Sequence, residues 1–221
     1  MAERVRSRFR QGARATLPFM VAVAGFGISF GLLARAAGMG ALPPVVMSAT
    51  TFAGSAQFAA AGILEAGGAV GAAVAAAVLL NARYGPMGIS IAPVFRGPAW
   101  RRLLAAQLIV DESWAISGGR DGRFDLGRLI GSGVVLYVAW VGSTAVGALG
   151  GAVLGDPDAL GLDAAFPALF LALLWPQVRE GRAVVAALAG AAIALALMPV
   201  APPGVPIIAA SLACLAGIRR R

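Results

Sequence analysis

The sequence predicts an all-α integral membrane protein: a polytopic helical bundle with six to eight spans and at least one broken or re-entrant helix in its first half. Three observations lead to this prediction. Of the 221 residues, 59% are hydrophobic and only 13% are charged, whereas a soluble domain carries about 25% charged residues. Several apolar runs reach the roughly 20 residues that a helix needs to cross a hydrocarbon core about 30 Å thick. Finally, charged, Gly and Pro residues interrupt the third of these runs.

The residue types present exclude several classes of function. The net charge is +8, but the 18 basic residues are all arginine and most of them lie between the apolar runs. That placement is typical of membrane topology rather than of nucleic-acid binding. Histidine is absent and Cys214 is the single cysteine, which excludes His-based acid–base catalysis, His-ligated haem, most zinc sites and an intramolecular disulfide. We therefore expect no enzymatic activity, no cofactor and no bound metal.

The apolar runs define the expected spans. An unpaired amide in lipid costs several kcal/mol, so a run that crosses the bilayer must be helical. Small residues four positions apart let membrane helices approach closely, and such pairs occur at Gly27 and Gly31, Gly67 and Gly71, Gly127 and Gly131, and Gly147 and Gly151. The candidate spans are residues 16–37, 41–64, 67–93, 129–152, 160–178, 183–200 and 203–218, with a shorter apolar piece at 103–117.

Two interpretations fit the basic N-terminus. Five arginines between Arg4 and Arg14 precede the first apolar run, as in the basic region of a signal peptide. The apolar run is longer than a usual signal core, however, and Arg35 would lie inside the cleavage motif. We therefore expect a basic cytoplasmic arm at residues 1–15. A single transmembrane domain at 16–218 follows, with halves at 16–117 and 129–218, and then a basic cytoplasmic tail at 219–221.

The arginines also predict the orientation in the membrane. Basic residues favour the cytoplasmic side, which places both termini there together with the loop of Arg120, Arg123 and Arg128 and the turn of Arg179 and Arg182, while Asp156, Asp158 and Asp163 are expected outside. The first half must then contain an even number of crossings. If all four of its apolar pieces cross, Arg96, Arg101 and Arg102 lie outside, against this tendency. We therefore expect a re-entrant or broken piece, with 103–117 and 67–93 as the candidates.

Polar residues within the second apolar run form the first candidate cluster. Its members are Ser48, Thr50, Thr51, Gly54, Ser55 and Gln57. Gln57 brings two donors and one acceptor to membrane depth. One interpretation is an interhelical hydrogen bond worth less than about 2 kcal/mol. The other is a substrate contact.

The second cluster, residues 81–86, lies well inside the third run. Pro86 has no amide and clashes with the carbonyl four residues earlier, so the helix is predicted to kink or break here. Broken membrane helices free backbone groups and mark transporter sites near the midplane. Arg83 carries a planar fork of donors that suits a carboxylate. The alternative is that Arg83 extends to the interface along its apolar stem.

The third cluster is Asp111 and Glu112, with Gln107, Ser113 and Trp114 close by in the sequence. Two adjacent carboxylates in an apolar piece need partners, or a pKa raised by desolvation. In the first interpretation, one of them carries a proton near neutral pH and Arg83 is a counter-ion. In the second, the piece lies at the interface and both acids are in water.

Taken together, these residues resemble the AzlC family, the large subunit of two-component branched-chain amino acid exporters. The resemblance rests on Pro18, the region of Gly25 to Gly31, Met47–Ser48, Phe52–Phe58, Leu80–Tyr84 and Asp111–Glu112, over roughly residues 16–115. Beyond this stretch the likeness is one of hydropathy and length. The combination of Gly-Ser-Ala-Gln-Phe with Asn-Ala-Arg is the most specific part.

The resemblance implies a secondary exporter of small apolar amino acids, acting with a small AzlD-type membrane subunit. We expect it to lie in the bacterial inner membrane and to be driven by the proton gradient. In this hypothesis Arg83 holds the substrate carboxylate, Ser55, Gln57 and Asn81 hydrogen-bond the polar end of the substrate or the broken backbone, and Tyr84 is a further substrate-binding residue. Asp111 or Glu112 would bind the amino group or carry the proton. The family commonly has His where this chain has Tyr84, which makes the two acids the better proton carriers. The alternative is a non-transporting assembly or sensor component whose polar residues serve helix packing.

Overall fold

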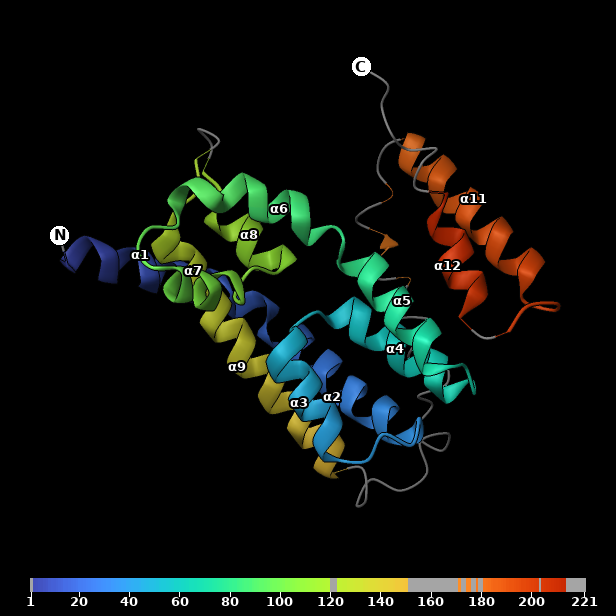
Figure 1. The fold of residues 1–221 in the computed structure, drawn as a ribbon. Coiled ribbons are helices and arrows are strands. Elements are labelled where there is room, and N and C mark those ends of the chain that lie inside the picture. The colour runs from blue at the N-terminus through green and yellow to red at the C-terminus, as the bar shows by residue number, and fades with distance from the viewer. Residues whose placement is uncertain are drawn as a thin grey trace.

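The described residues form an all-helical protein. The computed structural model describes residues 2–119, 123–150, 171, 174, 175, 178, 181–202 and 204–213. Over these residues the only extended pairing is an isolated bridge between Gly118 and Phe124, so the predicted all-α class is confirmed (Figure 1). The α-helices are α1 (Ala2–Ala15), α2 (Met20–Ala36), α3 (Leu42–Thr51), α4 (Gly54–Glu65), α5 (Val70–Asn81), α6 (Tyr84–Ile91), α7 (Ala99–Ala106), α8 (Asp111–Ser117), α9 (Leu126–Gly150), α11 (Gly181–Leu197) and α12 (Val205–Ser211), with short 3-10 turns η1 (Leu17–Phe19) and η2 (Ala92–Val94).

Helices α2 and α9 form the closest-packed pair. A Cβ atom added to Gly31 would lie 2.5 Å from backbone atoms of α9, and one added to Gly147 would overlap the backbone of Ile28. Arg35, at the end of α2, donates from Nη1 to the Ala148 carbonyl at 3.0 Å. Residue numbers therefore rise together along the two helices, which run parallel. Glycine at these positions is what allows the two backbones to touch.

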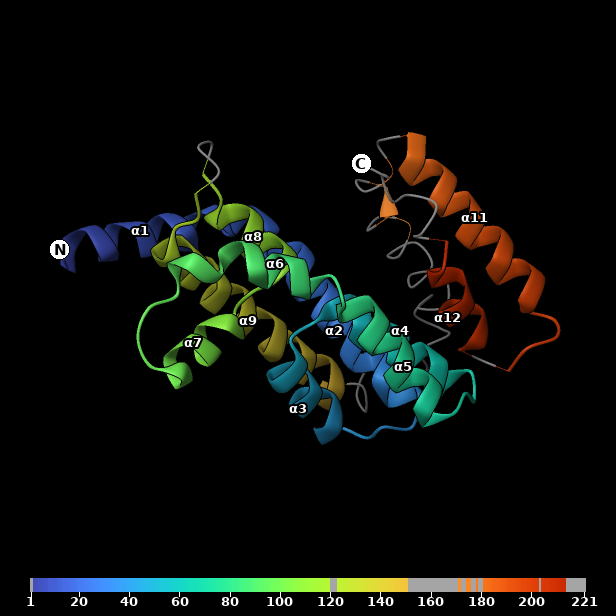
Figure 2. The same cartoon turned by 45° about the horizontal axis from the view of Figure 1, so that its top comes forward.

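The N-terminal segment is a helix docked on the start of α9 rather than a loose arm (Figure 2). Gly131 of α9 packs directly against the backbone of Phe9. The Arg8 Nε atom lies 3.5 Å from Asp125 Oδ2, and Arg128 donates to Gln11 Oε1 at 3.2 Å. The N-terminal helix and the segment that leads into α9 therefore lie at the same end of the molecule.

The three other apolar pieces of the first half are each interrupted. The predicted run 41–64 consists of α3 and α4, and the run 67–93 consists of α5, α6 and η2. The shorter piece at 103–117 lies within α7 and α8. The sequence favoured a break in 67–93 or 103–117. A further change of direction lies in 41–64, where α3 and α4 turn back on one another in both Figure 1 and Figure 2.

Among the described residues, three helical stretches are long and apolar enough to cross a membrane. They are Arg6–Ala36, Val70–Val94 and Leu126–Gly150, and Gly181–Leu197 is a shorter apolar helix. Many large apolar side chains on these helices are exposed, among them Val74, Val78, Val138 and Leu188, as expected of faces that contact lipid. The predicted run 160–178, the acidic stretch at 156–163, Arg179 and the tail at 219–221 lie outside the described residues, apart from residues 171, 174, 175 and 178.

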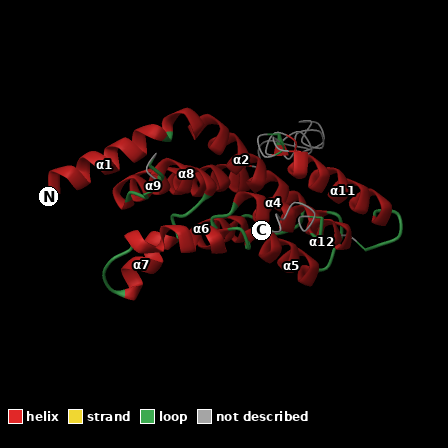
Figure 3. Cartoon of the chain, turned by 90° about the horizontal axis from the view of Figure 1, so that it is seen from above, coloured by secondary structure: helices red, strands yellow, loops and turns green. Residues whose placement is uncertain are grey.

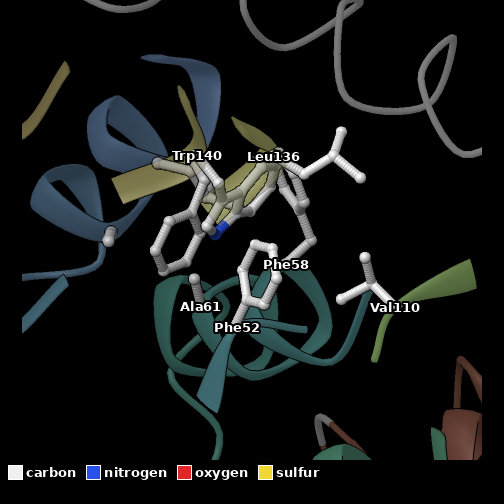
Figure 4. Close-up of a cluster of buried hydrophobic side chains, with 9 residues drawn as sticks. Phe52, Phe58, Ala61, Val110, Leu136 and Trp140 are labelled. Carbon is white, nitrogen blue, oxygen red and sulfur yellow. The ribbon is translucent and has the colours of Figure 1, made fainter. Parts of the chain in front are cut away.

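An aromatic core forms where α2, α4 and α9 meet (Figure 4). Phe30 stacks on Trp140 with ring centroids 6.3 Å apart, and Phe58 meets Phe30 edge-on at 5.7 Å. Seen from above, α2, α4, α8 and α9 group together, while α5 connects this group with α11 and α12 (Figure 3). The interrupted helices are therefore anchored on one side by the packed pair α2 and α9.

Candidate functional site

The first interruption, between α3 and α4, is held in an unusual backbone conformation. Phe52 has φ 45° and ψ 51°, and it is the only described residue other than glycine with positive φ. Ala53 is extended, with φ −142° and ψ 84°. A left-handed backbone conformation at a residue other than glycine costs about 1–3 kcal/mol. It persists only where the surrounding contacts enforce it. Here Phe52 is 5% exposed and its ring meets that of Tyr137 edge-on at 5.1 Å.

Side chains from other helices satisfy the backbone groups that this interruption frees. The Tyr137 hydroxyl donates to the Ala49 carbonyl at 2.8 Å. Gln107, in the connection between α7 and α8, donates from Nε2 to the Thr50 carbonyl at 2.8 Å. Unpaired carbonyls at membrane depth are costly, so such partners are what make a broken helix tolerable. They also join the first interruption to the third, between α7 and α8.

The second interruption, at Ala82 and Arg83, separates α5 from α6. The Ala82 amide bonds to Leu79 O at 3.2 Å and the Gly85 amide bonds to Ala82 O at 3.1 Å. Both are bonds between residues three apart, so the α-helical ladder gives way to a tighter turn. Pro86 explains this locally, because it has no amide for the carbonyl four residues earlier. The predicted disruption is therefore a local one: Ala82 and Arg83 keep helical backbone angles within the helical stretch Val70–Val94, and Arg83 lies in the tighter turn.

Arg83 brings the interrupted segments together. Its Nη2 atom lies 2.8 Å from Asp111 Oδ2, donates to Ser55 Oγ at 3.0 Å and lies 3.4 Å from the Tyr84 hydroxyl. The guanidinium also sits over the Tyr84 ring, 5.2 Å from its centroid. Ser55 is in the first turn of α4 and Asp111 begins α8. A single cation therefore connects the start of α4, the turn between α5 and α6, and the start of α8.

The Arg83 and Asp111 side chains remain accessible, with exposed fractions of 40% and 46%. Glu112, next to Asp111, lies outside the three candidate spans. It reaches the surface, but the protein around it removes hydration and raises its pKa above the ordinary value; the charge of Asp111 adds to this, and Arg83 opposes it. This corner thus combines a cation that can bind a carboxylate with a carboxyl group whose pKa is raised by desolvation.

Asn81 contributes an unpartnered acceptor. It is the last residue of α5, and its Oδ1 atom is buried with no hydrogen-bond partner over the described part of the chain. Buried polar atoms are normally paired. The sequence placed Asn81 among the binding residues, and the structure leaves this oxygen free for a donor.

Gln57 lies apart from this group. Its side chain is fully buried, accepts from Trp140 Nε1 at 3.0 Å and donates to Ser48 Oγ at 2.8 Å. Of the two interpretations of Gln57, these contacts favour the packing one. The predicted residues Ser55, Arg83, Tyr84 and Asp111 meet directly, and Glu112 adjoins them. The sequence did not single out Tyr137 or Thr144, although polar groups within the apolar run of α9 were the signal for them.

The comparisons with known proteins place this site inside a family domain. The sequence profile of a family described as AzlC protein matches residues 18–154. The chain belongs to the AzlC family. The matched stretch contains every residue of the Arg83 group, and the resemblance predicted from residues 16–115 is confirmed. No solved structure matches the chain.

Several relatives of this AzlC-family chain are membrane proteins by name. An "Uncharacterized membrane protein" of Archaeoglobus fulgidus is 36% identical over 211 residues, covering 93% of this chain and 91% of the relative. The "Branched-chain amino acid transport protein AzlC" of Bacillus subtilis is 28% identical over 191 residues, covering 85% and 75%. "Inner membrane protein YgaZ" of Escherichia coli is 28% identical over 227 residues, covering 95% and 86%. The likeness thus extends over most of each chain.

Proposed function

We propose that this AzlC-family protein is a secondary transporter that exports branched-chain or similar small apolar amino acids across the bacterial inner membrane. The observation that carries the proposal is the accessible Arg83 guanidinium beside a helix break, paired with Asp111 at 2.8 Å. The name of the Bacillus subtilis relative supports the substrate class. Broken helices with polar groups at the break are the usual construction of a transporter binding site.

Arg83 would hold the carboxylate of the amino acid. A guanidinium presents several donors in one plane and binds carboxylates in a defined orientation. Asp111 now occupies that position, so a substrate carboxylate would take its place on Arg83. The free oxygen of Asn81 would then offer an acceptor for the substrate's ammonium group. Ser55 and Tyr84, which both contact Arg83 Nη2, would fix the orientation of the guanidinium.

Proton coupling would use the acid pair. A carboxyl group whose pKa is raised is partly protonated closer to neutral pH, and Glu112 is such a group. Its neighbour Asp111 forms the ion pair with Arg83. Release of Asp111 from Arg83 adds an uncompensated negative charge beside Glu112, which favours proton uptake there. Substrate binding and protonation would then be linked through Arg83.

The packing supports an orientation with both ends of the first half on the cytoplasmic side. Since α2 and α9 run parallel, both begin on the same side of the membrane. In Figures 1 and 2, α3 and α4 turn back on one another, and α5 and α6 then lead back toward α1. In this arrangement α3 and α4 form a re-entrant pair, and Arg96, Arg101 and Arg102 lie with the N-terminus. That placement restores the positive-inside tendency.

Two further parts of the proposal rest on the sequence. The number of spans, six to eight, rests on the apolar runs, to which α11 contributes. A small AzlD-type membrane subunit as partner rests on the family resemblance. The exposed apolar face of α5, which includes Val74 and Val78, is available to lipid or to a helix of such a subunit.

The alternative is a non-transporting assembly or sensor component, and the buried Gln57 network favours it. Efflux from cells loaded with labelled leucine separates the two functions. Arg83→Ala should lower efflux at least about tenfold, the effect of losing a charged hydrogen bond. Arg101→Ala is the matched control, because Arg101 stacks on Trp100 outside the site. Unchanged efflux in Arg83→Ala, at equal protein level, would exclude the proposed site.

A further inference from the structure

A buried hydrogen-bond network around Gln57 connects both sides of the first interruption with α9. Gln57 Oε1 accepts from the Ala53 amide at 3.1 Å and from Trp140 Nε1 at 3.0 Å. Gln57 Nε2 donates to Ser48 Oγ at 2.8 Å, and that hydroxyl bonds to Thr144 Oγ1 at 2.9 Å. Gln57, Ser48 and Thr144 are all fully buried. The network is therefore closed off from water and from substrate.

The network fixes the conformation of the break. Ser48 belongs to α3, Gln57 belongs to α4, and Ala53 is the extended residue between them. The Ala53 amide would otherwise be an unpaired donor next to Phe52 in its left-handed conformation. By bonding this amide, Gln57 closes the first turn of α4 onto the break. Trp140 and Thr144 tie the same group to α9, which packs closely on α2.

We propose that Gln57 is a positioning residue for the Arg83 site. Ser55 lies between Ala53 and Gln57, so the network sets the position of the Ser55 hydroxyl, which Arg83 Nη2 contacts at 3.0 Å. Gln57 thus acts on Arg83 through the first turn of α4 and does not touch substrate. The effect of Gln57 on transport rests on the proposed function. The effect of Gln57 on the position of Ser55 relative to Arg83 does not, because it concerns only the geometry of this chain.

An amide is the group that this position requires. One oxygen must accept from two donors while the nitrogen donates to a hydroxyl, and Gln supplies both functions without charge. A protonated Glu can reproduce the pattern, because its second oxygen carries a hydrogen for Ser48. An ionised Glu would bury a charge, which is unfavourable. Leu has a similar size and makes none of these bonds.

Cross-linking tests the geometric part directly. In a Cys214→Ser background, Ser55→Cys and Asp111→Cys place two thiols at positions whose native side chains both contact Arg83 Nη2, at 3.0 and 2.8 Å. A short thiol cross-linker should join them. Adding Gln57→Leu should lower the yield severalfold, whereas Ser132→Ala should not. Ser132 is the matched control, since it is buried on α9 and its hydroxyl donates within its own helix, to the Arg128 and Leu129 carbonyls.

Transport tests the functional part. In otherwise native protein, Gln57→Leu should raise the KM for leucine efflux about tenfold, as expected when a binding group is misplaced, with a much smaller change in maximal rate. Gln57→Glu should show a KM closer to wild type at pH 5.5 than at pH 8, each compared with wild type at the same pH. Gln57→Glu and Thr144→Val replace Gln57→Leu if that variant fails to accumulate.

Each outcome decides the inference. A cross-linking yield that does not depend on Gln57, or no cross-linking in the parent pair, overturns it. A lower maximal rate at unchanged KM, with no rescue of Gln57→Glu at low pH, also overturns it. If wild type moves no amino acid while cross-linking still depends on Gln57, the proposed function fails and the positioning of Arg83 by Gln57 stands.

Discussion

Arg83 Nη2 lies 2.8 Å from Asp111 Oδ2, which joins the turn between α5 and α6 to the first residue of α8. The two residues are 28 positions apart in the sequence, and both side chains are partly exposed. Ser55, from a third interrupted segment, contacts the same nitrogen. Arg83 and Asp111 thus meet at a point where three helical segments are interrupted.

Removal of the Asp111 charge should tighten the binding of leucine. Asp111 competes with the substrate carboxylate for Arg83, and an exposed ion pair of this kind is worth about 0.2–1 kcal/mol. Asp111→Asn should therefore lower the Kd for leucine by up to about fivefold, measured by calorimetry on purified protein. Asp125→Asn, which breaks the separate pair with Arg8, should leave the Kd unchanged. Weaker binding in Asp111→Asn would mean that Asp111 contacts the substrate instead of competing with it.

Glu112 should make stability depend on pH. Because desolvation raises its pKa in the folded protein, the folded state holds this proton more tightly than the unfolded state does. The contribution of Glu112 to the free energy of unfolding is therefore fully present below the unfolded carboxyl pKa, about 4.3. It is lost as the pH rises through the higher folded pKa. Glu112→Gln should raise the Tm at pH 8 and change it little at pH 4.

Thermal unfolding in detergent at the two pH values measures this effect. Glu65→Gln is the control, because Glu65 is exposed at the end of α4. An equal gain in Tm at both pH values would show that the Glu112 effect does not come from its ionisation.

The contact between α2 and α9 should be sensitive to one added methyl group. A Cβ on Gly147 would overlap the backbone of Ile28, whereas a Cβ on Gly142 meets nothing within 4 Å. Gly147→Ala should thus destabilise the protein by about 1–3 kcal/mol through overpacking. Gly142→Ala, on the same helix, should be neutral or slightly stabilising. Thermal unfolding of the two variants side by side measures the difference, and equal Tm values would contradict the packing described.

The sequence allowed some of these features to be predicted and concealed others. Pro86 has no amide, so the break beside it could be located to within a few residues. The break at Phe52 could not, because neither Phe52 nor Ala53 is a residue that interrupts helices. Its conformation depends on Gln57, Gln107 and Tyr137, which come from three segments far apart in the sequence.

The glycine spacings were predictive in part. Gly27 and Gly31 do meet α9, and Gly127 and Gly131 meet α1. Gly67 and Gly71 show no such helix contact within the described part of the chain. A Cβ on either would meet nothing within 4 Å over the described residues, and Gly67 instead has φ +76° in the turn before α5. A spacing of four shows that close approach is sterically allowed, but whether another helix is present depends on the tertiary fold.

The central claim, that Arg83 binds the substrate carboxylate, is tested most directly by comparing the Kd of leucine with that of leucinamide, which lacks the carboxylate. Wild-type protein should prefer leucine at least about tenfold, and Arg83→Ala should bind the two about equally. If Arg83→Ala keeps the wild-type preference for leucine, the carboxylate is bound elsewhere and the account is contradicted.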